Sequence, residues 1–249
     1  METNPGQRRP VPAVCRILYS NVRVMAGNLS DLSMASSQYD ILLSSEILVS
    51  DKHHVSELLV PSFGHPALLC LGKMHQARGM AAYGRNGSRT FRQPKFECGC
   101  SEILVFKVCG VGHNLYVYSL YCYPDLDDKI FDCLQASMAA VQAEDVRASS
   151  LFVGDLNGHH QKWLGSMTMN RHGVAVFDFA TVSGCDQLVV GPTHARGGTP
   201  VISMAQAVPN FCGSRKVFMK HQANWYTVCG AIRNCLGVTF GFQTILLRF

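Results

Sequence analysis

The feature that most constrains the fold is the segment 151–160, which reads LFVGDLNGHH. An apolar run of the length of a buried strand ends abruptly in Asp155, and Asn157, His159 and His160 follow. Buried strands of layered sheets deliver polar side chains to the edge of the sheet in this way. In an extended segment the side chains of Asp155 and Asn157 point the same way. The segment therefore predicts a polar site at the end of a core strand.

Composition favours a globular intracellular protein. The 249 residues are 47% hydrophobic, which can supply the core of one large domain. The eleven cysteines are an odd number and no signal segment precedes them, so we expect reduced thiols in the cytoplasm or the nucleus. No apolar run approaches the roughly 20 residues of a membrane span. A net charge of +5 suits a polyanionic partner.

Apolar runs alternate with helical patterns along most of the chain. Strands are expected at 14–19, 39–43, 103–108, 115–121 and 151–155, and helices at 29–38, 125–143 and 174–182. Strand–helix alternation mixed with hairpin pairing predicts an α/β fold, a layered sandwich with mixed sheets. Residues 1–12 are expected to be a flexible N-terminus. Residues 200–249 show no clean alternation.

Other polar residues stand near expected strand ends. Asn21 follows the strand at 14–19, and Glu46 follows the strand at 39–43. Taken singly, Asn21 is more typical of a turn and Glu46 of a solvated surface. Basic residues gather at 73–95 and favour equally a solvated face and a groove that follows a phosphate backbone. The candidates for that groove are Arg78, Arg85, Arg89 and Arg92.

The residue types around Asp155 favour metal-assisted chemistry. Of Asp155 and Asn157, one can bind a hard divalent cation while the other holds a phosphate oxygen or an attacking water. Oxygen ligands suit Mg²⁺ or Mn²⁺ better than zinc. The sequence has no phosphate-cradling glycine motif and no motif for a serine or cysteine nucleophile. Hydrolysis by this chain would therefore use an activated water.

With these residues in view, the sequence resembles a known superfamily. Gly154–His160, with 163–165 behind it, is similar to the Gly-Asp-Phe-Asn-Ala-His signature of the endonuclease/exonuclease/phosphatase superfamily. More narrowly, it resembles the endonuclease domain that non-LTR retrotransposons carry ahead of their reverse transcriptase. Four further stretches agree in order and spacing, namely 20–23, 43–46, 78–82 and 119–124. The resemblance implies a four-layer sandwich in which helices flank two packed sheets.

The resemblance also implies roles for the site residues. Glu46 would be the principal ligand of Mg²⁺ or Mn²⁺, assisted by Asn21. Tyr121 would contact the scissile phosphate of DNA, and Asp155 would position or deprotonate the attacking water. Asn157 would hold a phosphate oxygen, while His160 would support the site loop. No stable protein partner and no membrane association are expected.

The sequence departs from the family pattern after Thr199. The family continues into an Asp-bearing strand and a Ser-Asp-His motif, but here the last aspartate is Asp186, and the only histidine after Thr199 is His221. We hypothesise that an internal segment near 199/200 has been lost. This would leave a domain at 13–203, incomplete at its C-terminal end, and a linker-like tail at 204–249.

The functional expectation is a metal-dependent DNA endonuclease of retrotransposon origin whose activity is impaired. Loss of a positioned general acid or base typically costs about 10²- to 10⁴-fold in rate. Two alternatives remain open. One is a non-catalytic nucleic-acid-binding remnant or an unstable fragment, and the other is a phosphatase of the same superfamily.

Overall fold

A computed structural model gives the structure of the chain. It describes residues 14–22, 29–47, 58–64, 66–69, 79–99, 102–109, 114–123, 129–161, 168–187, 201–206, 218–220 and 241–248. The expected flexible N-terminus, Arg78 and the Thr199–Pro200 junction lie outside these ranges. Within them, no helix combines the length and the apolar character needed to cross a membrane.

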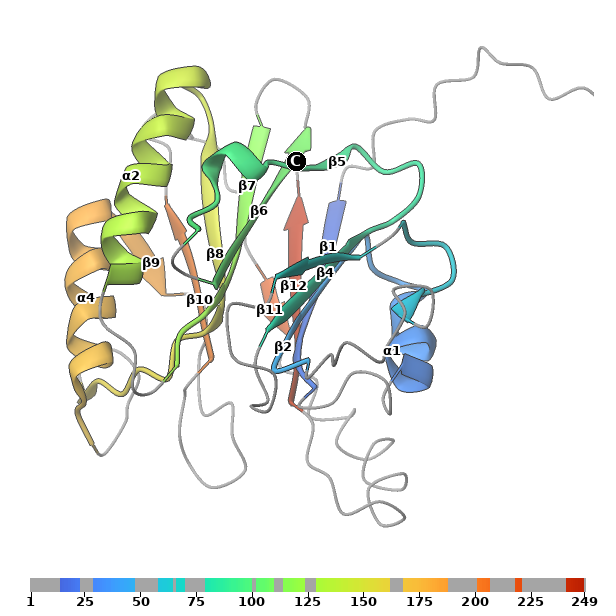
Figure 1. The fold of residues 1–249 in the computed structure, drawn as a ribbon, viewed down its shortest axis with the longest axis horizontal. Helices are drawn as coiled ribbons and strands as arrows, with labels where there is room; N and C mark the ends of the chain where they lie inside the picture. The colour runs from blue at the N-terminus through green and yellow to red at the C-terminus, as the bar shows by residue number, and fades with distance from the viewer. Residues whose placement is uncertain are drawn as a thin grey trace, which may run out of the picture.

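The first sheet is mixed and has the strand order β11-β12-β1-β2-β4-β3. Strands β1 and β2 run parallel, and the other neighbouring pairs are antiparallel. Its strands are β1 Val14–Asn21, β2 Ile41–Ser45, β3 Ala67–Leu69, β4 Met80–Gly84, β11 Phe218–Lys220 and β12 Gly241–Arg248. Helix α1, Leu29–Ser36, lies outside this sheet (Figure 1).

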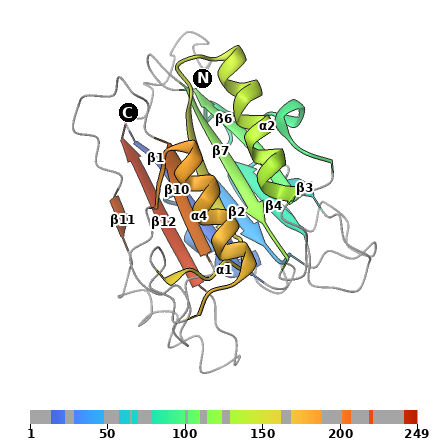
Figure 2. The ribbon, with the colours of Figure 1, turned by 90° about the vertical axis from the view of Figure 1, so that its left-hand side faces the viewer.

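The second sheet is also mixed and has the order β5-β6-β7-β8-β10-β9. Only the pairing of β7 with β8 is parallel among its described strands. The strands are β5 Thr90–Arg92, β6 Glu102–Cys109, β7 Asn114–Tyr121, β8 Ser149–Asp155, β9 Cys185–Gln187 and β10 Val201–Gln206. Helices α2, Lys129–Glu144, and α4, Arg171–Ser183, cover its outer face, and Figure 2 views this layer from the helix side.

Three apolar layers hold the sandwich together because side chains alternate along each strand. Between the sheets, odd-numbered residues of β1 and β2, such as Ile17, pack against side chains of the second sheet. These are even-numbered residues of β6, such as Leu104, and odd-numbered residues of β8, such as Val153. The opposite faces pack outward, with Phe152 against Phe179 of α4 on one side. Together with the layer under α1, these cores confirm the expected four-layer α/β sandwich of two mixed sheets.

The C-terminal region contributes strands as well. β12 pairs antiparallel with β1 along all eight of its residues, from Val14 opposite Arg248 to Asn21 opposite Gly241. β10 begins at Val201 and pairs antiparallel with β8. The region from which the sequence predicted a linker-like tail therefore supplies two strands of the first sheet, β11 and β12. Pairing with β1 satisfies backbone groups that an exposed sheet edge would leave open.

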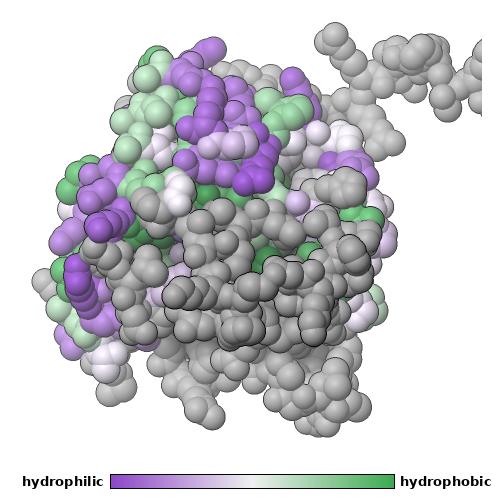
Figure 3. Space-filling model, viewed as in Figure 1, coloured by the Kyte–Doolittle hydropathy of each residue, from purple (hydrophilic) through white to green (hydrophobic). Residues whose placement is uncertain are grey.

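Ion pairs mark the upper end of the sandwich in Figure 1, where α2 ends. Lys95 pairs with Glu144 of that helix, Lys107 lies 3.7 Å from Asp145, and Arg92 pairs with Glu97 at 2.8 Å. Figure 3 shows hydrophilic residues gathered on the upper part of this face. This end is opposite the one where β7 and β8 terminate.

Candidate active site

Four strands end at the same edge of the sandwich and bring polar side chains together there. β1 and β2 run parallel, as do β7 and β8, and Tyr121 stands opposite Asp155 in the register. Because Asn21, Tyr121 and Asp155 are odd-numbered like the central-core residues of their strands, they extend that inner face beyond the core. Strand periodicity thus places three residues from distant parts of the sequence at one site.

Glu46 joins this cluster through an unusual backbone conformation. It directly follows β2 and has φ 55°, in the left-handed region that residues with a Cβ rarely adopt. Its neighbours are fixed, because Val22 N donates to Ser45 O at 3.1 Å and Ile47 N donates to Gly79 O at 3.3 Å. The Tyr121 hydroxyl donates to Glu46 Oε1 at 3.1 Å. The surrounding structure therefore maintains a strained residue whose carboxylate lies at the site.

Asp155 is buried more deeply than Glu46 and is 5% exposed. Its Oδ2 accepts from Asn21 Nδ2 at 3.2 Å, and its Oδ1 accepts from the backbone N–H of Asn157 at 3.0 Å. Burial is the main cause that raises the pKa of Asp155 to about 7; the negative charge of Glu46 adds to the rise, and the hydrogen bonds from Asn157 and Asn21 oppose it. A carboxyl group near its pKa at neutral pH can both accept and release a proton.

The tyrosines at the site remain protonated donors. Burial, together with the charges of Glu46 and Asp155, raises the pKa of Tyr121 above the ordinary range. Tyr19 lies deeper, and its hydroxyl is 2.7 Å from Ser45 Oγ. Burial also raises the pKa of Tyr19 well above its usual value. A neutral Tyr121 can therefore donate a hydrogen bond to Glu46 or to an anionic oxygen.

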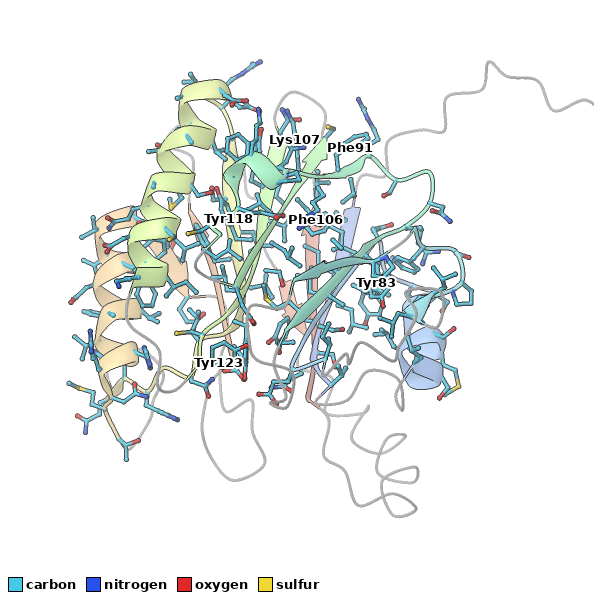
Figure 4. The ribbon with its side chains drawn as sticks, viewed as in Figure 1. Tyr83, Phe91, Phe106, Lys107, Tyr118 and Tyr123 are labelled. Carbon is cyan, nitrogen blue, oxygen red and sulfur yellow. The ribbon has the colours of Figure 1, made fainter. Side chains whose placement is uncertain are left out.

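A third carboxylate was missed by sequence reasoning. Glu102 opens β6, pairs across the sheet with Tyr121, and is 2% exposed. Its Oε1 accepts from the Tyr123 hydroxyl at 2.6 Å, and the Tyr123 ring packs edge-on against Tyr121 at 4.8 Å between centroids. Figure 4 shows Tyr123 at the lower edge of the sandwich. The only sequence signal for Glu102 was its place as a charged residue at the start of an apolar strand, and a charged residue in that place is usually solvent-exposed.

The segment after Asp155 is shaped by close packing. Asn157 has φ 47°, and its Nδ2 donates to Cys122 O at 2.8 Å. Position 154, directly before Asp155, has room only for glycine, because a Cβ there would lie 2.0 Å from Leu120 O. His160 is 6% exposed and stacks on Phe177 of α4, with 4.5 Å between ring centroids and 9° between planes. His160 thus lies in the packing against α4.

The structure does not bring the described arginines of the basic segment to this site. Arg85 follows the end of β4, and Arg89 directly precedes β5, which ends at Arg92. The strand registers place both of these segments toward the opposite end of the sheets from Tyr121. In Figure 4, Phe91 and Lys107 lie at that upper end, far from Tyr123. Arg85 donates to the carbonyls of Ser36, Ser37 and Tyr39 at 2.7–3.0 Å, and Arg92 pairs with Glu97. Arg85 and Arg92, two of the residues that the sequence predicted to contact phosphate, therefore form intramolecular bonds.

Arg85→Ala is expected to destabilise the fold by about 1–3 kcal/mol and to leave DNA affinity unchanged. The substitution removes the donors to the carbonyl of Ser36 at the end of α1 and to those of Ser37 and Tyr39 just after it. It also removes the guanidinium that lies 4.8 Å from the Phe63 ring centroid. Urea unfolding and fluorescence anisotropy with a labelled duplex measure the two effects, and the exposed Arg89→Ala is the control. Weaker DNA binding with unchanged stability would contradict this role.

The donor set fits a hard divalent cation. Two carboxylates, those of Glu46 and Asp155, lie close enough that one raises the pKa of the other. Asn21 Oδ1 is buried and has no hydrogen-bond partner among the residues that the structure describes. The described residues hold no cluster of three or more His, Cys, Asp or Glu side chains arranged for a metal. Mg²⁺ commonly takes only one or two protein carboxylates and completes its shell with water and phosphate oxygens, so this smaller set suffices.

Comparisons with known proteins identify the fold. No protein-family model matches the sequence, and the search of curated proteins found no match. Solved structures do match. The endonuclease domain of TRAS1, a telomere-specific non-LTR retrotransposon, aligns with TM-score 0.62 and 14% identity over 94% of this chain and 98% of its own. An AP endonuclease from Leishmania major aligns with TM-score 0.63 and 9% identity, covering 95% and 88%.

A 3′ phosphatase from Neisseria, solved with product DNA hairpin, has TM-score 0.55 and 14% identity over 94% of this chain and 99% of its own. All three structures match the fold of this chain although they are only 9–14% identical to it in sequence. The chain therefore has the fold of the endonuclease/exonuclease/phosphatase superfamily.

Proposed function

We propose that this chain is a Mg²⁺- or Mn²⁺-dependent DNA endonuclease related to the target-site endonucleases of non-LTR retrotransposons, with impaired turnover. The observation that carries the proposal is the hydrogen-bonded cluster at the end of β1, β2, β7 and β8. There Asn21 contacts Asp155 and Tyr121 contacts Glu46. The resemblance of five sequence stretches and the likeness to the TRAS1 endonuclease domain support the retrotransposon origin.

The residues present divide the work of hydrolysis among them. Glu46, assisted by Asn21, would hold the cation, which would supply positive charge to the phosphate oxygens in the transition state. Asp155, held by Asn21 Nδ2 and by the backbone N–H of Asn157, would position or deprotonate the attacking water. The protonated Tyr121 and the Asn157 side chain would orient the phosphate. No side chain here needs to form a covalent intermediate.

The impairment follows from the sequence after Thr199. No Ser-Asp-His motif follows that residue, so the histidine that this family uses opposite the metal is missing. We propose that a segment was lost near 199/200, and that β10, which begins at Val201, is the remnant of a later strand. Sequencing the genomic DNA between the codons for Thr199 and Pro200 tests this. Ser-Asp-His codons in a skipped exon would support it, and uninterrupted coding sequence would leave genomic decay as the only route.

Plasmid nicking tests the function. With enzyme in excess over supercoiled plasmid, we expect slow nicking in Mg²⁺, none in chelator, and at least about 10²-fold less with Glu46→Gln. Asp178→Asn, on the exposed face of α4, is the matched control and should nick at the wild-type rate. Multiple rapid turnovers that Glu46→Gln abolishes would refute the impairment. Salt-dependent DNA binding without any nicking would favour the alternative of a binding remnant.

A further inference from the structure

Asn170, directly before α4, makes three hydrogen bonds with its side chain. Oδ1 accepts from Gly173 N and from His159 N, each at 2.8 Å. Nδ2 donates to Asn157 O at 2.7 Å. Two N–H donors on one atom and a carbonyl on the other fix the orientation of this amide. One side chain therefore caps a helix and ties down two residues of the site loop, which we define as residues 156–160.

Asn157 receives the most consequential of these bonds. Its left-handed backbone, with φ 47°, turns its N–H onto Asp155 Oδ1 at 3.0 Å. Its Nδ2 is held by Cys122 O at 2.8 Å. A residue with a Cβ keeps this conformation only when its surroundings enforce it. The bond from Asn170 to its carbonyl supplies part of that enforcement on the side away from the site.

The site loop lies directly on the start of α4. A Cβ at Gly173 would be 1.9 Å from His159 O, and a Cβ at Gly158 would be 3.3 Å from the Gly173 Cα. One turn further along α4, the Phe177 ring stacks against the His160 ring. The loop and the helix therefore meet without space for a larger residue, and Asn170 makes the polar connection between them.

We propose that Asn170 is a positioning residue that holds Asn157 in its left-handed conformation and thereby keeps the Asn157 N–H on the Asp155 carboxylate. Asn170 touches neither Asp155 nor the cation site, so it acts through Asn157. Its importance for DNA cleavage rests on the proposed function. Its effect on the site loop does not, and can be measured in a chain that cleaves nothing.

Two substitutions separate the hydrogen bond from Asn170 to Asn157 O from the capping of α4 by Asn170. Asn170→Ser and Asn170→Asp keep a side-chain oxygen that caps α4, so both are expected to fold. Neither can donate to Asn157 O as the Asn170 amide does, because serine is too short and the carboxylate has no N–H. Thr181→Ala is the matched control on the same helix, since it removes the exposed Thr181 Oγ1 bond to Phe177 O and touches nothing in the loop.

Amide hydrogen exchange and single-turnover nicking are measured on the full chain. In both Asn170 variants the Asn157 amide should exchange at least about tenfold faster, while Gly173 keeps its protection. The cleavage step should slow about 10- to 100-fold with the DNA KM unchanged, since a misplacement of about 1 Å has that cost. Thr181→Ala should change neither.

Unchanged exchange at Asn157 in both variants would overturn the positioning role. A proportional rise of KM without loss of cleavage rate would also overturn it, because it would indicate a DNA contact rather than a positioning residue. Faster exchange in a chain whose wild type never nicks DNA would retain the role of Asn170 and refute the proposed function instead.

Discussion

Asp155→Asn is expected to abolish Mg²⁺-dependent nicking, with a rate loss of at least about 10³-fold, while making the cation-free chain more stable at pH 8. The two effects have opposite signs for one reason. Burial and the charge of Glu46 make an ionised Asp155 unfavourable in the cation-free folded chain, and a cation held beside it would offset that cost. The isosteric amide removes the charge, so it removes both the cost and the chemistry.

Single-turnover nicking and urea unfolding in chelator measure these two effects. Asp178→Asn, an exposed carboxylate on α4, is the control for the loss of a negative charge and should change neither quantity. A variant that loses nicking because it is less stable than wild type would show that Asp155 acts as a structural acceptor. A variant that still nicks would remove Asp155 from the reaction.

The second large expected effect is a pH dependence of the free energy of unfolding, which a divalent cation should cancel. The pKa of Asp155 is raised from 3.8 to about 7 in the folded chain, so folding favours its protonated form. Without cation, the free energy of unfolding should therefore fall as pH rises from about 4 to about 7. A shift of about three units corresponds to an upper limit of about 4 kcal/mol, at about 1.4 kcal/mol per unit.

Mg²⁺ should reverse this loss at pH 8 and have little effect at pH 5, where Asp155 is already protonated. Urea unfolding at several pH values, with Mg²⁺ and with chelator, measures the effect, and Asp155→Asn serves as the control that should lack this contribution to the slope. Equal stabilisation by Mg²⁺ at pH 5 and pH 8 would place the cation elsewhere.

Strand periodicity was sufficient for the layers and for Asp155, whereas Asn21, Glu46 and Tyr121 were predicted from the family resemblance. Odd and even positions along β1, β7 and β8 decide which face each residue occupies, and a polar residue after an apolar run marks where each strand ends. Asn21, Tyr121 and Asp155 could therefore be assigned to one edge once the strands were known to end together. Their register, with Tyr121 opposite Asp155, depends on pairing between distant segments and appears only in the structure.

Local sequence failed where a side chain's partner lies far along the chain. Arg85 looked like a phosphate contact because no carboxylate is near it in sequence, yet its partners are backbone carbonyls 46 to 49 residues away. Glu102 carried only a weak signal and Asn170 carried none, because each acts through a residue of another element. The pairing of β12 with β1 was missed for the same reason, since it joins the two ends of the described chain.

The central claim is that the edge where β1, β2, β7 and β8 end binds a divalent cation. Paramagnetic broadening by Mn²⁺ tests it most directly in a ¹⁵N-labelled chain. We expect substoichiometric Mn²⁺ to broaden the side-chain amide signals of Asn21 and Asn157 first and to leave the Asn114 side chain at the opposite end sharp. This pattern should be lost in Glu46→Gln. Broadening that centres on another part of the chain, or that persists unchanged in Glu46→Gln, would contradict it.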